Sequence, residues 1–177
     1  MTDIDPRYPI GPFLPPGTVG AELRASFVDT IERTPAALRA AVAGLDEARL
    51  DTPYRQGGWT VRQVVHHLPD SHLNAYVRFK LALTEDEPTI RPYQEARWAE
   101  TPEARRGDIA MSLALLEALH ERWTACLRAL PVTAFSRTFV HPESGRWTLD
   151  RLLALYVWHG RHHVAQITSL RRRLGWS

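Results

Sequence analysis

The chain has 177 residues, of which 44% are hydrophobic and 24% charged, and its net charge at neutral pH is +2. This composition is that of an ordinary globular protein, and the length suffices for one domain, residues 1–177, with a full hydrophobic core. The small net charge gives no reason to expect nucleic acid as a partner, and no apolar run approaches the roughly 20 residues that span a membrane.

The segment from residue 6 to residue 17 contains five prolines, which are incompatible with a regular helix. We therefore expect an extended arm that lies over the body of the protein, anchored by Tyr8, Ile10, Phe13 and Leu14. Residues 1–6 lack the basic start and the apolar stretch of a secretion signal, so we expect a cytoplasmic protein.

Hydrophobic periodicity predicts a first helix that begins near Ala21 and continues to about Leu45, with a kink at Pro35. Its predicted buried stripe consists of Leu23, Phe27, Ile31, Leu38, Val42 and Leu45. Residues 51–58 are rich in turn-forming residues and are predicted to form a loop.

A second helix is expected after Thr60, because Thr60 and Gln63 match a capping box. Pro69 lies in its interior, where we expect a local kink rather than a break. The next connection, residues 85–107, is long for two adjacent antiparallel helices. This length indicates that it crosses an end of the bundle or covers something, with a short helix over residues 93–98.

A third helix is predicted from about Asp108 to Leu130, with His120 on its apolar seam. Residues 136–141 and 145–147 are typical of a small hairpin, after which a fourth helix begins. Four long amphipathic helices with almost no strand predict an all-α four-helix bundle. The arginines at 171–173 would complement the dipole at the end of the last helix.

The fourth helix contains His159 and His163, one helical turn apart on a face that is otherwise apolar. Two imidazoles at this spacing can point at one metal ion. Cys126 is the only cysteine, so no disulfide within the chain and no thiolate cluster can form, and a metal would need nitrogen or oxygen ligands.

An internal similarity suggests the third ligand. The second and fourth helices both begin with a tryptophan followed by a threonine cap, at Trp59 and Trp147, and His67 lies eight residues after the first tryptophan. If both faces point inward, His67 joins His159 and His163. The alternative is that all three are separate core histidines bonded to backbone or water.

The remaining histidines have weaker signals. His66 and His162 are offset by about 100° from His67 and His163 and are expected to point toward the flanks of the bundle or toward neighbouring helices. His72 and His141 carry no spacing signal. For His120 we favour core packing, with a fourth metal ligand or a proton carrier as the alternative.

Several stretches together resemble the YfiT branch of the DinB/YfiT-like superfamily. They are the segment from Gly57 to His67, the segments at 70–74 and 79–85, the arm at 8–11 and the segment from Trp158 to His163. The resemblance covers nearly the whole chain. It implies a homodimeric four-helix bundle with zinc or nickel held by three histidines, which map to His67, His159 and His163.

Members of this superfamily are described as metal-dependent hydrolases, and some relatives transfer low-molecular-weight thiols of the bacillithiol or mycothiol type. Three protein ligands leave a coordination position open, which fits either hydrolysis or thiol transfer. We favour S-transfer of such a thiol to an electrophile; the alternatives are a hydrolase and a non-catalytic dimer that the metal stabilises.

No paired acid and base can be named from the sequence, so the catalytic residues stay unassigned. Residues one turn from the ligands are expected to line the pocket, namely Ser71, Tyr156 and Gln166, with ordinary interhelical bonding as the alternative. Arg62, Arg78 and Arg161 would either meet an anionic thiol or lie on solvated helix faces. The first histidine of the pair is not followed by glutamate, which disfavours a metalloprotease.

Overall fold

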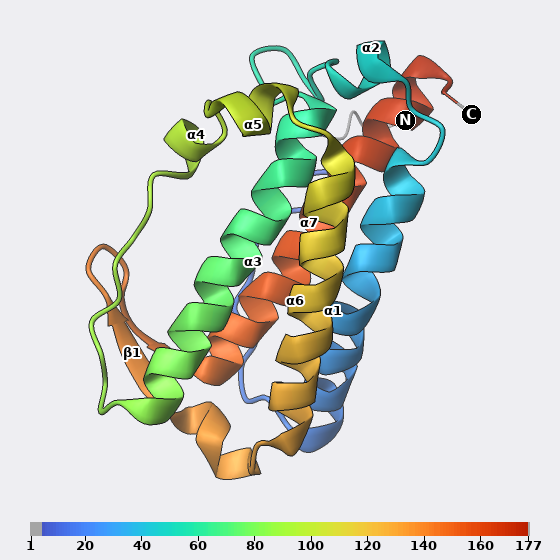
Figure 1. Cartoon of the computed structure of the whole chain (residues 1–177). Coiled ribbons are helices and arrows are strands. Elements are labelled where there is room, and N and C mark those ends of the chain that lie inside the picture. The colour runs from blue at the N-terminus through green and yellow to red at the C-terminus, as the bar shows by residue number, and fades with distance from the viewer. Residues whose placement is uncertain (1–4, 177) are drawn as a thin grey trace.

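The computed structural model describes residues 5–176 and shows a bundle of four long helices (Figure 1). These helices are α1 (Ala21–Val42), α3 (Val61–Thr84), α6 (Ile109–Ala129) and α7 (Leu149–Leu174). The shorter elements are α2 (Glu47–Leu50), α4 (Glu95–Trp98), α5 (Pro102–Arg106), the 3₁₀ turn η1 (Val132–Ser136) and the antiparallel strands β1 (Thr138–His141) and β2 (Gly145–Thr148). Within residues 5–176, no helix is both long and apolar enough to cross a membrane.

The predicted four-helix bundle with a small hairpin before the last helix is therefore confirmed. Helices α1 and α3 each pack against both α6 and α7, so α1 and α3 lie on a diagonal. Figure 1 shows that α1 and α7 run in one direction and that α3 and α6 run in the other. Because α3 and α6 are parallel neighbours, the chain between them must return along the length of the bundle, which explains the long connection at 85–107.

The helix boundaries follow the capping signals. Thr60 Oγ1 accepts a hydrogen bond from the Gln63 amide at 3.1 Å, and Gln63 Oε1 accepts one from the Thr60 amide at 3.0 Å, which confirms the capping box. Thr148 likewise accepts from the amide of Arg151 at the start of α7. Pro35 and Pro69 both lie inside continuous helices, so neither breaks its helix.

The predicted buried stripe of α1 is wrong in one residue. Leu23 is 41% exposed, because the inward stripe of α1 passes through Arg24, Val28 and Ile31 instead. The Arg24 guanidinium reaches this side because it forms two hydrogen bonds with the Asp150 carboxylate, at 2.7 and 2.8 Å.

The N-terminal arm lies along α7, but three of its four predicted anchors are exposed, namely Tyr8 (46%), Ile10 (41%) and Leu14 (79%). Leu14 does not hold the arm, whereas the Tyr8 ring still lies 6.0 Å from that of His162. Its contacts are aromatic and polar. Phe13 packs on Trp158 with ring centroids 6.0 Å apart, and the Trp158 Nε1–H group donates to the carbonyl of Gly11 at 3.1 Å. The arm therefore reaches the face of α7 that lies next to the histidine pair.

The core consists of two hydrophobic clusters separated by a polar layer. One cluster contains Phe79, Trp123 and Leu153, and the other contains Leu38, Leu68 and Ile167. Between them, at the middle of each long helix, the buried residues are Thr34, His67, Ser71, His72, His120, His159 and His163, of which His159 is only partly buried. The bundle therefore concentrates histidines at one level, which we call the histidine layer.

The first testable consequence concerns the close approach of α1 and α7 beside this layer. A Cβ at Gly160 would lie 2.8 Å from Cγ2 of the buried Thr34. Gly160→Ala is therefore expected to lower the free energy of unfolding by about 1–3 kcal/mol, although alanine is the better helix former. Urea denaturation measures this.

Two variants control for other causes. Gly17→Ala adds a methyl group where no atom lies within 4 Å, and it should leave stability nearly unchanged. Thr34→Ser removes Cγ2 and should recover part of the loss in the Gly160→Ala background. A Gly160→Ala protein as stable as the wild type would contradict the close packing.

Candidate metal centre

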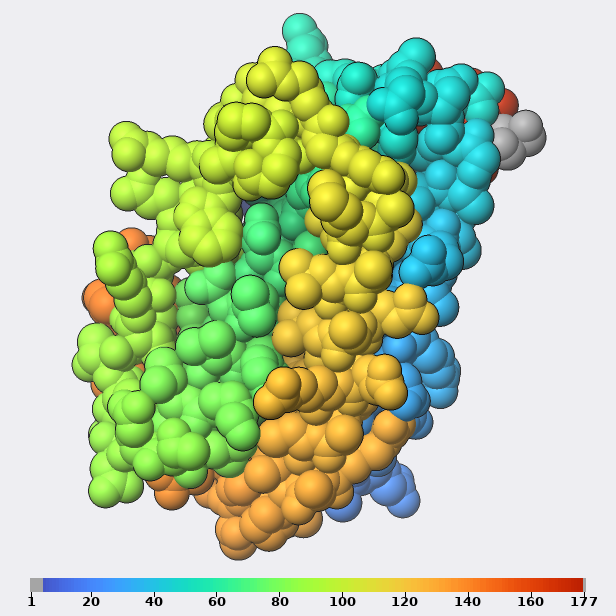
Figure 2. All heavy atoms as spheres, in the orientation of Figure 1, coloured from blue at the N-terminus to red at the C-terminus, as the bar shows by residue number. Residues whose placement is uncertain are grey.

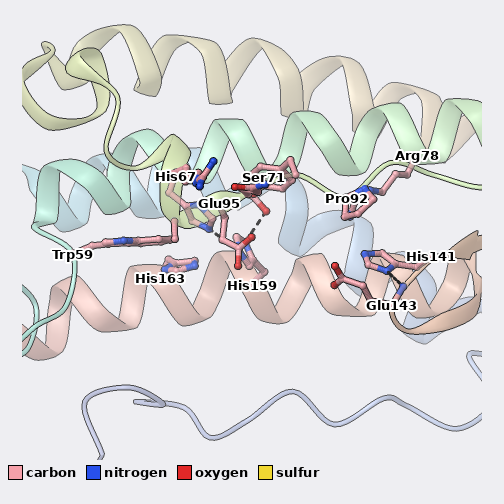
Figure 3. Close-up of a pocket in the computed structure, with 14 residues that line it drawn as sticks. Trp59, His67, Ser71, Arg78, Pro92, Glu95, His141, Glu143, His159 and His163 are labelled. Carbon is pink, nitrogen blue, oxygen red and sulfur yellow. Dashed lines mark hydrogen bonds between the residues drawn. The ribbon is translucent and has the colours of Figure 1, made fainter.

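Three histidines from two antiparallel helices meet in the middle of the bundle. His67 comes from α3, while His159 and His163 come from α7, and one ring nitrogen of each lies within 4.8 Å of those of the others. The Nε2 atoms of His67 and His159 are 3.2 Å apart. The structure thus brings together the three residues that the spacing and the resemblance selected, as Figure 3 shows.

The donor set fits a divalent metal ion. In a tetrahedral zinc site with Zn–N bonds of about 2.0–2.1 Å, neighbouring nitrogens lie about 3.3 Å apart, close to the separation of the His67 and His159 nitrogens. Nδ1 of His163 contacts Gln166 Oε1 at 2.8 Å, and Nδ1 of His159 contacts His72 at 3.2 Å. The Nε2 atoms of His159 and His163 are therefore the ones left to face the space between the three histidines.

Burial keeps these rings neutral, which is the form that binds metals. It lowers the pKa of His67 to about 4, and the pKa values of His159 and His163 fall well below the ordinary value for the same reason. The positive charge that a neighbouring imidazole would carry lowers each pKa further.

Only one of the two similar tryptophans belongs to the site. The Trp59 ring lies 4.7 Å from that of His67 and 6.5 Å from that of His163, so it forms a wall of the centre. Trp147 instead lies on strand β2, packed against Phe139 and covered by the Arg151 guanidinium. The similarity selected the histidine that the structure brings next to His159 and His163, but the two tryptophans do not mark equivalent positions.

The histidines open into a cleft of about 840 Å³. The connection at 85–107 forms one wall, so the prediction that this segment covers something is confirmed. Other lining groups are Ser71 and Arg78 on α3 and His141 and Glu143 on the hairpin, and Figure 3 shows Glu95 projecting from α4 on the side of the histidines.

Two further hollows adjoin this cleft. One, of about 530 Å³, lies on the side of the N-terminal arm and shares Trp59, Glu95 and His163 with the first cleft. The other is visible in Figure 2 between the connection and α3, where Asn74 and Tyr93 are among its lining residues. The histidine centre is thus accessible from two sides.

The four expected pocket residues have different positions. Ser71 lines the cleft, with Oγ 3.5 Å from His159 Nε2 and 3.3 Å from the Tyr156 hydroxyl. Tyr156 is buried behind Ser71, and Gln166 accepts from His163 while lining the second cleft. His120 lies outside the three-histidine cluster and contacts His72 in the core.

Neither flanking histidine belongs to the cluster. His66 contacts Ser112 of α6 and the carbonyl of Gly107. His162 contacts Gln166 of its own helix and lies beside Tyr8 of the N-terminal arm. Arg62 matches neither prediction, because its buried guanidinium is paired with Glu47 and Asp51 instead of meeting solvent or a ligand.

Arg78 lines the main cleft, whereas the exposed Arg161 lines a separate apolar hollow between α1 and α7.

Sequence reasoning missed His72, Glu95, His141 and Glu143. The last three come from irregular or short segments, whose position over the bundle no periodicity reports. His72 lies five residues after His67, a spacing that puts it about 140° around the helix from that ligand. It reaches the layer because it points between α6 and α7, where it contacts both His120 and His159.

The chain is similar to proteins of one superfamily. Residues 30–167 match the model of the DinB superfamily. The chain is 51% identical, over the full length of both proteins, to the "Putative metal-dependent hydrolase YfiT" of Bacillus subtilis, and 52% identical to a relative of the same designation from Bacillus mycoides, over 97% of this chain and 99% of the relative.

A solved structure of Bacillus subtilis YfiT superposes with a TM-score of 0.95 over 97% of this chain and 99% of that one, at 51% identity. That protein is described as "a probable metal-dependent hydrolase with an unusual four-helix bundle topology". In the present chain the four-helix bundle has α3 and α6 as parallel neighbours, joined by the long connection at 85–107.

Loss of one ligand should abolish stable metal binding. We expect the wild type to hold about one divalent ion per chain and His163→Ala to lose affinity by more than about 100-fold. Elemental analysis after dialysis measures this. His66→Ala, which removes an equally buried imidazole outside the cluster, should retain the metal; retention by His163→Ala would place the site elsewhere.

The buried histidines also predict a pH dependence for the metal-free protein. Because their pKa values are lower in the folded than in the unfolded chain, the unfolded chain takes up more protons below pH 6.5. Stability is therefore complete above about pH 7.5 and falls as the pH drops through 6.5 toward 4. Each histidine with a folded pKa of about 4 lowers the free energy of unfolding by about 2 kcal/mol between pH 6.5 and pH 5.

Urea denaturation in the presence of a chelator at pH 5, 6.5 and 8 tests this dependence. Between pH 6.5 and 8 each histidine predicts a change of only about 0.4 kcal/mol, because half of the unfolded chain's imidazoles are protonated at pH 6.5, so pH 8 serves as the baseline. Equal stability at pH 5 and pH 6.5 would show that the layer is not buried in its neutral form.

Proposed function

The chain belongs to the DinB superfamily, and on this premise we propose that it is a metal-dependent enzyme that transfers a low-molecular-weight thiol, of the bacillithiol type, to an electrophilic small molecule. His67, His159 and His163 would hold zinc or nickel. The relatives' designation as metal-dependent hydrolases supports the metal-dependent enzyme; the thiol and the identity of the metal are our extension.

The observation that carries the extension is the pair of clefts that meet at the histidines. A water molecule occupies about 30 Å³ and needs no cleft of its own, whereas two organic reactants do. The clefts of about 840 and 530 Å³ share Trp59, Glu95 and His163, so two reactants bound on either side would meet at the metal centre. Arg55 lines the smaller cleft and suits an anionic thiol, whereas Arg7 in the same cleft is paired with Asp5.

The bound metal would supply Lewis-acid chemistry that favours the deprotonated thiol. Among the chain's own residues, Glu95 lines both clefts and is placed to accept the S–H proton. The sulfur then forms a bond to the electrophilic carbon, whose leaving group departs with the electron pair; the proton on Glu95 passes to the oxygen of an opened epoxide, or to solvent when the leaving group is a halide. Trp59 excludes water from one side of the histidines, and Arg78 can bind a negative charge on the electrophile.

Two other readings remain open to experiment. The designation of the relatives favours a hydrolase, in which water takes the place of the thiol. A non-catalytic bundle that the metal only stabilises would show neither reaction. The homodimer also stays a prediction; exposed apolar side chains such as Leu73 and Val77 on α3 and Met111 and Leu115 on α6 support it.

The test is to incubate the zinc- or nickel-loaded protein with an alkyl halide or an epoxide, with and without bacillithiol. We expect formation of the thioether only when thiol and metal are both present, and a loss of about 10²–10⁴-fold in rate for Glu95→Gln with metal content unchanged.

Glu121→Gln is the control, because Glu121 is exposed on α6 and lines neither cleft. Turnover of an ester or amide without thiol would favour the hydrolase instead. Absence of both reactions with the metal retained would favour the stabilising role.

A further inference from the structure

Behind the metal centre, two fully buried histidines connect His159 to the backbone of α1. Nδ1 of His159 lies 3.2 Å from Nε2 of His72, Nδ1 of His72 lies 2.8 Å from Nε2 of His120, and Nδ1 of His120 lies 2.6 Å from the carbonyl oxygen of Ile31. His72 is 0% exposed and His120 is 1% exposed. The chain of hydrogen bonds therefore crosses the bundle from α7 through α3 and α6 to α1.

The Ile31 carbonyl is available because of Pro35. In a helix the carbonyl of residue 31 would accept from the amide of residue 35, but proline has no N–H group. The freed oxygen accepts from His120 instead. A proline in the middle of α1 thus creates a buried acceptor that the rest of the layer can use.

The Ile31 carbonyl determines the direction of each of the three hydrogen bonds between His159 and α1. A carbonyl oxygen can only accept, so His120 carries its proton on Nδ1 and leaves a lone pair on Nε2. His72 must then donate from Nδ1 to His120, which leaves its own Nε2 as an acceptor. His159 donates from Nδ1 to that atom, and its Nε2 is left with a lone pair that faces His67.

The surroundings hold the two rings in place. The His72 and His120 rings lie side by side at an interplanar angle of 28°, with centroids 4.8 Å apart, and the Trp123 ring meets both edge-on. Tyr156 packs edge-on against the other side of His72 at 4.9 Å. Rings packed in this way cannot turn to exchange donor and acceptor without opening the core.

We propose that His72 and His120 are positioning residues, which hold His159 in its Nδ1–H tautomer and so keep the Nε2 lone pair of His159 directed into the metal centre. The proposal rests on the three-histidine metal site of the proposed function, but on neither the thiol nor the reaction. Gln166 gives His163 a comparable acceptor, so both ligands of α7 are oriented from behind.

The direct test reads the tautomers in the full-length, metal-free wild type. Long-range ¹H–¹⁵N correlation spectra of histidine-labelled protein distinguish Nδ1–H from Nε2–H rings. We call the hydrogen-bonded series His159–His72–His120–Ile31 the relay. It requires that His120, His72 and His159 all carry the proton on Nδ1. A proton on Nε2 of His159 overturns the proposal, and this measurement needs no variant, metal or substrate.

Zinc affinity of variants provides the second test. His72→Leu removes the acceptor and leaves the buried N–H of His159 unpaired or moves its proton to Nε2, so zinc affinity should fall about 10–100-fold. His72→Gln can present an amide oxygen near the position of Nε2. It should retain affinity within about tenfold of the wild type and keep the Nδ1–H signal of His159.

His66→Leu is the matched control, since His66 is an equally buried histidine of α3 that contacts neither the ligands nor the relay. Equal zinc affinity of His72→Leu and His66→Leu would overturn the positioning role. A correct tautomer pattern in a protein without transferase activity would leave the relay intact and reject the proposed reaction, so the two failures can be told apart.

Discussion

The histidine layer is the constraint on which the rest of the structure depends. A polar level inside a bundle loses solvation, and it persists only where each buried nitrogen has a partner. Here all four long helices supply a partner. The Ile31 carbonyl comes from α1, His67 and His72 come from α3, His120 comes from α6, and His159 comes from α7. The hydrophobic clusters on either side fix the helices that supply these groups.

The topology follows from the need to place α3 beside α7 in the antiparallel sense. His67 then faces the turn of α7 that carries His159 and His163, while α6 brings His120 to the same level. Because α3 and α6 are parallel neighbours, the chain needs a long return segment, and this segment becomes a wall of the cleft (Figure 1, Figure 3). One topological requirement thus creates both the metal centre and its cover.

Pro35 supplies the histidine layer with a hydrogen-bond acceptor, the carbonyl of Ile31. Pro35 leaves a carbonyl without its helical donor, which normally weakens a helix. In this bundle the oxygen anchors the hydrogen bonds that end at the metal centre, so a local defect becomes a partner for a buried ring. Gly160, next to His159, is needed for a different reason: it lets α7 approach Thr34 of α1 closely at this level.

The sequence alone determined the features that depend on local periodicity and capping. These were the four helices, the capping box at Thr60, the hairpin and the shared face of His159 and His163, because spacing along a helix predicts which side chains share a face. Only the tertiary structure decided which helices are neighbours and in which direction each hydrogen bond of the layer runs. His72 shows why: its partners lie on α6 and α7, far away in the sequence, and no periodicity within α3 reports them.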